Sequence, residues 1–202
     1  MKLTYQKCSC LNIFVWVCLV TVPLLFGFYS IKLGQDTNWD LLNYHLYNPY
    51  AYLHDRIHLD LAPAGLQSYF NPFLDVAYFS ALSVLSPKFM GFLIGLVQGI
   101  SFVFIYKICG QVLGRGREGY ALFLALAGLL SVGFLSEVGT TLNDSLIAVF
   151  PLASLWLAFS AIGQADGEFR KAVAPIVMSG VLIGLGCGYN AALHFTFESA
   201  HR

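Results

Sequence analysis

The 202-residue sequence is 57% hydrophobic and only 11% charged. Ordinary soluble domains carry about 25% charged residues, so this composition excludes a soluble globular protein. Eleven basic and eleven acidic side chains cancel, which leaves no net field to attract nucleic acid, and the five cysteines have neither disulfide-framework nor zinc-site spacing. We therefore expect a single all-α, polytopic transmembrane domain over residues 1–202, with the lipid bilayer and not nucleic acid as its surroundings.

Five stretches lack Asp, Glu, Lys and Arg over a length sufficient for a membrane-spanning helix, which needs about 17–25 residues. They predict spans at about 11–32, 88–108, 119–137, 145–164 and 172–195. The first is longer than a signal-peptide core of about 7–15 residues and lacks a small-residue cleavage site. It therefore reads as a retained signal anchor.

Residues 69–87 form the doubtful stretch, because Asp75 interrupts it. Lys and Arg gather on the cytoplasmic side of membrane proteins, so their positions decide between the two topologies. If this stretch does not span, seven basic residues share the side of the N-terminus and four lie opposite; if it spans, the bias is reversed. We therefore expect a cytoplasmic N-terminus and a long outer loop over residues 34–87 that contains juxtamembrane helices.

The outer loop begins with QDTNWDLLNYHLYNP, which predicts a short helix from about residue 36 to Pro49. On a 3.6-residue period, one face carries Asp40, Asn43, Tyr44 and Tyr47, and the other carries Trp39, Leu42 and Leu46. An amphipathic helix of this kind lies in the membrane interface and holds Asp40 at the surface. Two simpler explanations stay open: Asp40 as a helix cap, and the aromatic residues as an interfacial belt.

Other polar residues of the predicted outer face are less specific. His45, His54 and His58 lack a convincing metal-ligand spacing, so no metal ligands are assigned. Arg56 is suited to clamping a phosphate, although anchoring at lipid headgroups explains it equally well. Asp144 begins the fourth predicted span, where capping is one explanation and pairing with Asp40 on the same membrane face is another. Two such carboxylates can serve as a base and as a metal or substrate holder.

The order of these elements resembles a known family. A first span, an outer acid followed by Tyr-His in DLLNYHLYNP, then LHDRIHLDLAPAGLQSYFNP, a helical hairpin and a second outer acid in TTLNDSLIAVF are similar to the C-type (GT-C) polytopic membrane glycosyltransferases. That family includes oligosaccharyltransferases, protein mannosyltransferases and lipid A aminoarabinose transferases. The resemblance covers roughly residues 11–165.

The resemblance implies transfer of a sugar from a polyprenyl-phosphate carrier to an acceptor at the outer membrane face, with inversion. Asp40 would be the catalytic carboxylate of the first loop, which acts as general base or holds the acceptor or a metal, and Asp144, Tyr44, His45 and Arg56 would bind substrate. A divalent cation such as Mg or Mn is a candidate cofactor. The implied location is the bacterial inner membrane. Members of the family are generally longer, so we expect this chain to be an N-terminal fragment, and both activity and inactivity of the fragment alone stay open.

Two functions from other classes remain alternatives. A multi-pass transporter usually carries ionisable residues or broken, repeated helices near the membrane midplane, whereas the interiors of the predicted spans lack Asp, Glu, Lys and Arg. A non-catalytic membrane scaffold subunit would make no chemical use of Asp40 or Asp144.

Overall fold

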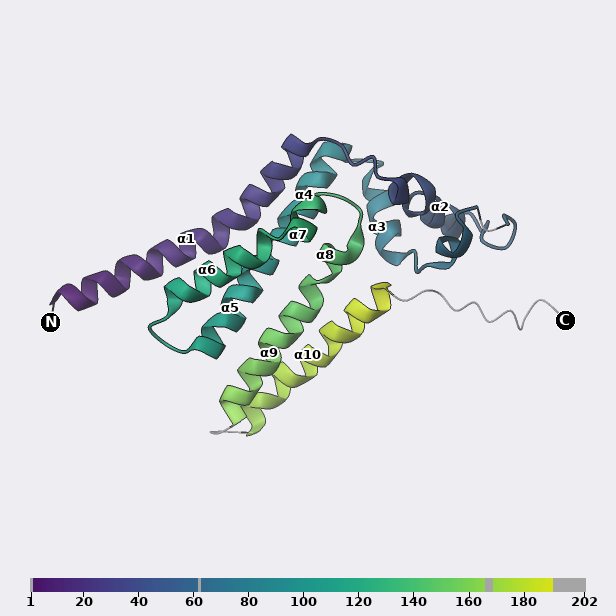
Figure 1. Ribbon diagram of the computed structural model, residues 1–202. Coiled ribbons are helices and arrows are strands. Elements are labelled where there is room, and N and C mark those ends of the chain that lie inside the picture. Colours follow the sequence, from purple (N-terminus) through teal and green to yellow (C-terminus); the bar gives the residue numbers. More distant parts are fainter. Residues whose placement is uncertain (1, 62, 166–168, 191–202) are drawn as a thin grey trace.

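The computed structural model describes residues 2–61, 63–165 and 169–190, and this part of the chain is helical without strands. Four segments are long and apolar enough to cross a membrane: Leu11–Leu33, Pro87–Leu113, Asn143–Gly163 and Arg170–Gly188. The all-α polytopic architecture expected from the sequence is therefore confirmed (Figure 1).

These spans are built from six of the helices. Helix α1 (Lys2–Leu33) forms the first span, and α4 (Pro87–Gly99) with α5 (Ser101–Leu113) forms the second. Helix α8 (Asn143–Ile147) leads into α9 (Val149–Ala165), and α10 (Phe169–Asn190) forms the last. The end of the last span predicted at residue 195 lies outside the described residues. In sequence order, α1 packs on α4, α5 on both α6 and α9, and α9 on α10.

Helix α4 approaches α1 closely along a row of glycines spaced four residues apart, Gly91, Gly95 and Gly99. A Cβ atom at Gly95 would lie 2.8 Å from the backbone oxygen of Phe26, and one at Gly99 would lie 2.7 Å from the Cα of Pro23. Small residues at this spacing let two helix backbones approach and gain van der Waals contact, which drives helix association in lipid.

The buried centre of the bundle lies where α1, α5 and α6 (Glu118–Leu129) meet. Phe102 and Ala125 are completely inaccessible to solvent, and Val22, Leu122 and Leu129 complete the cluster. Lipid tails are as apolar as these side chains, so hydrophobicity does not favour contact between the helices over contact with lipid. The tight packing of the side chains therefore holds the helices in this arrangement.

The predicted span 119–137 is not one continuous helix. Helix α6 has only 12 residues, about 18 Å of length, and α7 (Val132–Ser136) starts again after a break. At the break Ser131 is extended, and its hydroxyl accepts a hydrogen bond from the Phe134 amide at 3.4 Å. The chain after α7 packs beside Gln98, the twelfth residue of α4. It therefore does not reach the level of the first turn of α4, and a shorter helix than a full span suffices for α6.

Between α1 and α4 the chain forms short helices that do not span, as the sequence predicts. They are η1 (Leu41–His45), α2 (Tyr47–Leu53), η2 (Gly65–Tyr69) and α3 (Phe73–Ala81). Helix α3 covers the doubtful stretch with nine residues, far too few to cross a bilayer.

Pro49 does not end a helix here, contrary to the prediction. It is the third residue of α2, where the missing amide hydrogen costs nothing because the first turn of a helix has no acceptor for it.

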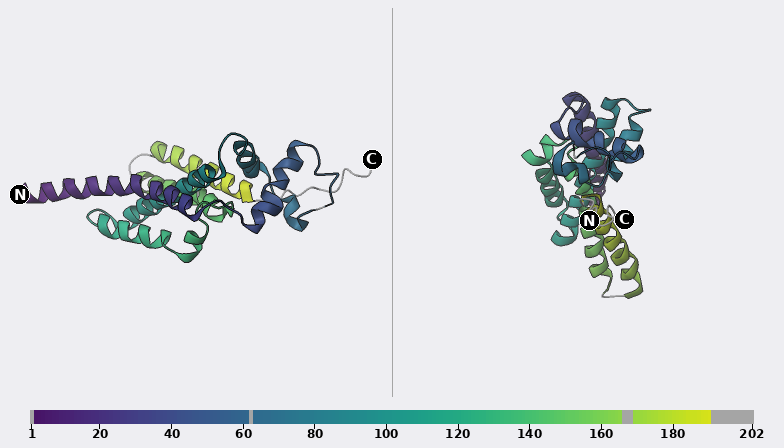
Figure 2. Two further views of the ribbon diagram at one scale, coloured as in Figure 1. Left: turned by 90° about the horizontal axis from the view of Figure 1, so that it is seen from above. Right: turned by 90° about the vertical axis from the view of Figure 1, so that its right-hand side faces the viewer.

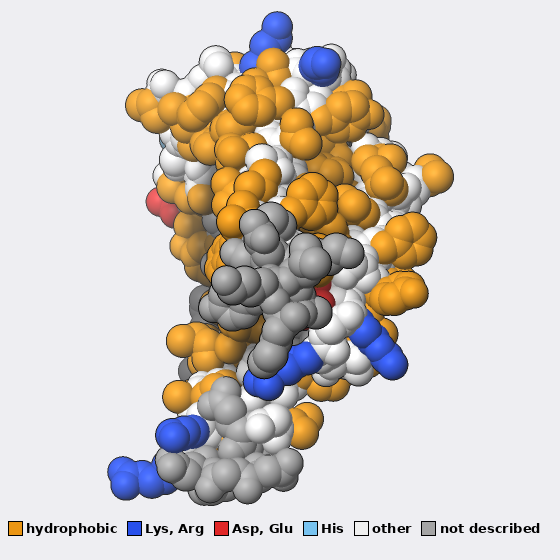
Figure 3. Space-filling view, turned by 90° about the vertical axis from the view of Figure 1, so that its left-hand side faces the viewer, with side chains coloured by type: hydrophobic (Ala, Val, Ile, Leu, Met, Phe, Trp, Pro, Cys, Tyr) orange, Lys and Arg blue, Asp and Glu red, His pale blue; other side chains and the backbone are white. Residues whose placement is uncertain are grey.

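The two ends of the bundle differ. Figures 1 and 2 show the short helices between α1 and α4 gathered at the end opposite the N-terminal end of α1. The connection between α7 and α8 reaches the same end, because Thr141 contacts Asp36 there. On the face shown in Figure 3, hydrophobic side chains cover most of the upper part, and basic side chains lie at the top and in the lower half. A broad apolar surface of this kind is expected for a protein embedded in lipid.

This arrangement predicts the sidedness of three positions. With the native cysteines removed, single cysteines at Asp40 and Asp144 should react with a membrane-impermeant thiol reagent in one vesicle orientation. A cysteine at Gly116, in the exposed turn between α5 and α6, should react in the opposite orientation. Labelling of Asp144 together with Gly116 would contradict the arrangement.

The glycine contact predicts a cost for a single methyl group. Gly95→Ala should lower the free energy of unfolding in detergent by about 1–3 kcal/mol, because its Cβ meets the backbone of α1. The matched control is Gly110→Ala in α5, where nothing lies within 4 Å of the new Cβ, and which should be neutral or slightly stabilising. Equal stability of the two variants would refute close packing at Gly95.

Candidate functional site

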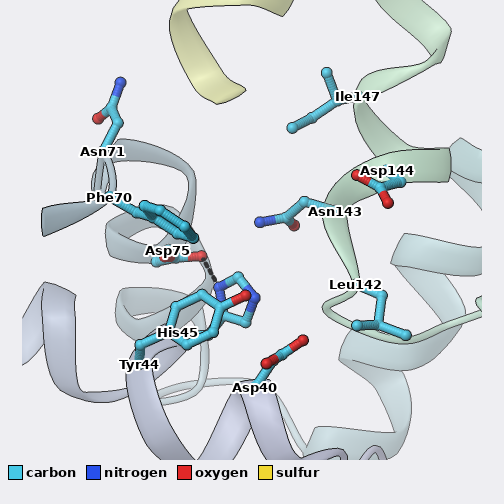
Figure 4. Close-up of a pocket in the computed structure, with 10 residues that line it drawn as sticks. All are labelled: Asp40, Tyr44, His45, Phe70, Asn71, Asp75, Leu142, Asn143, Asp144 and Ile147. Carbon is cyan, nitrogen blue, oxygen red and sulfur yellow. Dashed lines mark hydrogen bonds and ion pairs between the residues drawn. The ribbon is translucent and has the colours of Figure 1, made fainter. Parts of the chain in front are cut away.

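A polar cavity of about 190 Å³ lies at the end of the bundle that carries the short helices. One wall comes from residues 40–45, 70–71 and Asp75, and the other comes from the start of α8 (Figure 4). The lining residues are Asp40, Tyr44, His45, Phe70, Asn71, Asp75, Leu142, Asn143, Asp144 and Ile147.

Four of the five residues predicted for the site line this cavity: Asp40, Tyr44, His45 and Asp144. The two acids approach from separate elements, with Asp40 just before η1 and Asp144 in the first turn of α8. Arg56 does not line the cavity. Its guanidinium binds the Asp60 carboxylate through two bonds of 2.8 and 3.0 Å.

The local backbone of η1 turns both Tyr44 and His45 toward the cavity. The amide of Leu46 donates to the carbonyl of Leu41 at 3.2 Å, the five-residue spacing of a π-helix. Such a wide turn changes the side-chain register of a regular helix and is frequent at functional sites. Tyr44 and His45 are consequently both buried, while Trp39 and Leu42 stay exposed as the predicted amphipathic pattern requires.

Sequence reasoning missed the partner of His45. The Nδ1 atom of His45 lies 2.8 Å from a carboxylate oxygen of Asp75, and both residues are at least 95% buried. Asp75 comes from α3, so a separate helix fixes the orientation of the imidazole ring. The sequence signal was an acid inside an otherwise apolar stretch, which served only to argue against a span.

Tyr44 stays protonated at neutral pH. Burial raises the pKa of its phenol to about 12, and the negative charges of Asp40, Asp75 and Asp144 act in the same direction. Its ring centroid lies 4.2 Å from that of His45, and its edge meets Phe70 at 5.6 Å. Tyr44 therefore offers a neutral phenol next to three carboxylates.

Asp36 holds the two walls of the cavity together. One of its carboxylate oxygens accepts hydrogen bonds from the Thr141 amide at 2.8 Å and the Thr141 hydroxyl at 2.9 Å. The carboxylate also accepts from the amide nitrogens of Asn38, whose own side-chain oxygen accepts from the Leu41 amide at 2.7 Å. The chain that leads into η1 is therefore tied to the chain that leads into α8.

The segment before α8 is also fixed from α4. The Gln98 amide donates to the Glu137 carbonyl at 3.0 Å and the Ser145 hydroxyl at 2.9 Å, and it accepts from the Gly139 amide at 2.8 Å. The Glu137 carboxylate in turn accepts from the Ser145 amide at 3.0 Å, which satisfies a donor in the first turn of α8. These bonds set the position of Asp144.

Arg56 belongs to a separate polar cluster beside the cavity. The carboxylate of Asp60 accepts from Arg56 and from the Tyr47 hydroxyl at 2.6 Å. Hydrogen bonds from these two side chains lower the pKa of Asp60, and burial with the Asp60 bond raises the pKa of Tyr47 to about 12. This cluster ties α2 to the chain that follows it.

The described residues do not form a ready metal centre. No group of three His, Cys, Asp or Glu side chains among them is placed to hold a metal ion. Asp40 and Asp144 provide carboxylates of the kind that Mg²⁺ prefers, but the third carboxylate that lines the cavity, Asp75, is hydrogen-bonded to His45.

A second cavity, also of about 190 Å³, adjoins the first and shares Asp75 and Asn143 with it. Most of its other lining residues are apolar, including Leu74, Ala77, Met90, Ile94 and Leu146. The end of the bundle therefore places an acidic, polar cavity directly beside an apolar one.

Comparisons with known proteins give no match: no family model, no curated protein and no solved structure is significantly similar to the chain.

The bonds of Asp36 predict that Asp36→Asn weakens the junction between the two walls, because an amide nitrogen replaces an oxygen that accepts from Thr141. The free energy of unfolding should fall by about 1–3 kcal/mol, and hydrogen exchange of the Thr141 amide should accelerate. The matched control is Asp55→Asn, because Asp55 is exposed and has a positive φ of 54° that asparagine also tolerates. Unchanged exchange at Thr141 would contradict this role for Asp36.

Proposed function

We propose that this protein is a membrane glycosyltransferase that moves a sugar from a polyprenyl-phosphate carrier to an acceptor, with inversion. The observation that supports this proposal is the meeting of Asp40 and Asp144 in one cavity where the spans end. In this proposal the N-terminus is cytoplasmic and the cavity faces the outside of the bacterial inner membrane.

The chemistry needs few groups. Asp40 acts as the general base: its carboxylate takes the proton of the acceptor hydroxyl while that oxygen attacks the anomeric carbon. The bond from the anomeric carbon to the phosphate oxygen breaks on the opposite face, and the electron pair leaves with the phosphate. Asp144 and the neutral phenol of Tyr44 hold sugar or acceptor hydroxyls in the cavity.

The neighbouring apolar cavity supports an amphiphilic substrate. Because the two cavities share Asp75 and Asn143, we place one molecule across both, with a polar head beside Asp40 and a hydrocarbon chain beside Met90 and Ile94. A transporter would place its site between repeated helices, whereas this cavity is lined mainly by the short helices η1 and α3 and by the start of α8, at one end of the bundle.

The direct test uses membranes that contain the chain and a polyprenyl-phosphate-linked sugar with a radioactive label. Asp40→Asn should reduce transfer of the label by at least about 100-fold, because removing a general base costs about 10² to 10⁴ in rate. Thermal unfolding and membrane insertion should be unchanged.

The control for this experiment is Asp55→Asn, which removes an exposed acid from the same outer segment and should keep full transfer. Undiminished transfer by Asp40→Asn would eliminate the role of Asp40. Absence of transfer from every polyprenyl-linked donor, both by this chain and by a longer chain that contains it, would favour the scaffold alternative.

A further inference from the structure

The polar cavity contains an imbalance of charge. Three carboxylates line it, from Asp40, Asp75 and Asp144, and among the described residues that line it only His45 can become positive. Within the described part of the chain no Lys or Arg lines it, and the guanidinium of Arg56 is bound to Asp60. A phosphate among three carboxylates is repelled unless a cationic donor faces it.

The orientation of His45 suits that task. A carboxylate accepts hydrogen bonds only, so the Nδ1 atom of His45 carries a hydrogen and donates it to Asp75 across 2.8 Å. The other ring nitrogen, Nε2, points away from Asp75 and into the cavity (Figure 4). Tyr44 packs against the imidazole ring at 4.2 Å and limits its rotation.

We propose that His45, in its imidazolium form and oriented by Asp75, binds the phosphate of the lipid-linked donor through Nε2–H. This inference rests on the proposed function and adds the group that receives the leaving phosphate. During transfer the acceptor proton goes to Asp40, and the released electron pair converts the singly charged diester into a doubly charged monoester. The Nε2–H bond of His45 becomes stronger as that charge develops, which favours the transition state over the ground state.

The protonation state of His45 sets the pH dependence. The groups that face it are Asp75 from α3, Tyr44 and Asp40 from its own segment, and Asp144 from α8. The phenol of Tyr44 does not ionise below pH 8, since its pKa is raised to about 12. Because the proposed donor is the imidazolium form, phosphate binding should be stronger at acidic pH than at basic pH.

Asp75 is a positioning residue in this proposal. Its carboxylate fixes the ring so that Nε2 faces the ligand, and its negative charge compensates the imidazolium. Asp75→Asn retains size and an oxygen acceptor for Nδ1–H but loses the charge. Its effect should therefore be weaker phosphate binding at acidic pH, with the protein still folded.

The experiment measures binding to the purified chain in dodecyl maltoside micelles, which carry no phosphate. The probe is farnesyl methyl phosphate, a diester with one negative charge at every pH used, so that only the protein titrates. Calorimetry at pH 5.5 and 8.0 should show binding at least about tenfold tighter at pH 5.5, the size expected for one hydrogen bond to a charged group.

Two histidine variants make a matched pair. His45→Gln should weaken binding at pH 5.5 by about tenfold and abolish the pH dependence. His54→Gln removes an exposed histidine whose Nδ1 lies 2.8 Å from the Tyr50 carbonyl, and it should bind as the unmodified chain does. If His45→Gln fails to fold, Asp75→Asn and the pH profile of the unmodified chain still test the proposal.

The outcomes separate the two proposals. Binding of the diester that is equal at pH 5.5 and 8.0 would overturn the role of His45 and leave the glycosyltransferase proposal standing. No preference for the diester over farnesol at either pH would overturn both. Equal affinity for dimethyl phosphate, which has no chain, would keep the phosphate contact and eliminate the lipid-linked donor.

Discussion

The buried amide of Gln98 is the interaction on which the rest of this structure depends. The segment from Glu137 to Ser145 is irregular, yet it lies beside the interior of α4 and not beyond its end. In a bilayer such a segment must obtain its hydrogen bonds from protein, because hydrocarbon offers none. Gln98, completely inaccessible, supplies three of them. Because the segment from Glu137 to Ser145 lies beside Gln98 and not at the end of α4, α6 is short, the chain breaks before α7, and Asp144 lies where it does.

Asp36 provides hydrogen bonds of the same kind to the segment that leads into the opposite wall of the cavity. Its carboxylate receives Thr141 on one side and Asn38 on the other, so the start of η1 and the start of α8 share one set of hydrogen bonds. The irregular segments that lead into η1 and α8 are thus joined to each other and held against α4. Irregular backbone is expected at such sites, since loops on a rigid scaffold carry most binding residues.

Much of this could be predicted from the sequence. The lengths of the apolar stretches revealed most of the spans. The distribution of Lys and Arg depends on topology, so it also predicted that the segments of Asp40 and Asp144 lie at the same end of the bundle. The π-turn at η1, the break at Ser131 and the pairing of His45 with Asp75 were not predictable in this way. The pairing of His45 with Asp75 joins two segments that are distant in sequence, and a 3.6-residue period cannot represent the five-residue hydrogen bond of η1.

The order of chemical environments across the two cavities argues for the order of groups in the ligand. Carboxylates at Asp40 and Asp144 accept from hydroxyls and repel phosphate, so the hydroxyl-rich part of a ligand belongs there. His45 is the cation-forming group, and its partner Asp75 lies on the wall shared with the apolar cavity. A ligand that follows this sequence of environments has hydroxyls first, then a phosphate, then a hydrocarbon chain. The donor proposed above, a sugar on a lipid phosphate, has this connectivity, and a reversed or chain-free ligand would leave either the carboxylates or the apolar wall without a complementary partner.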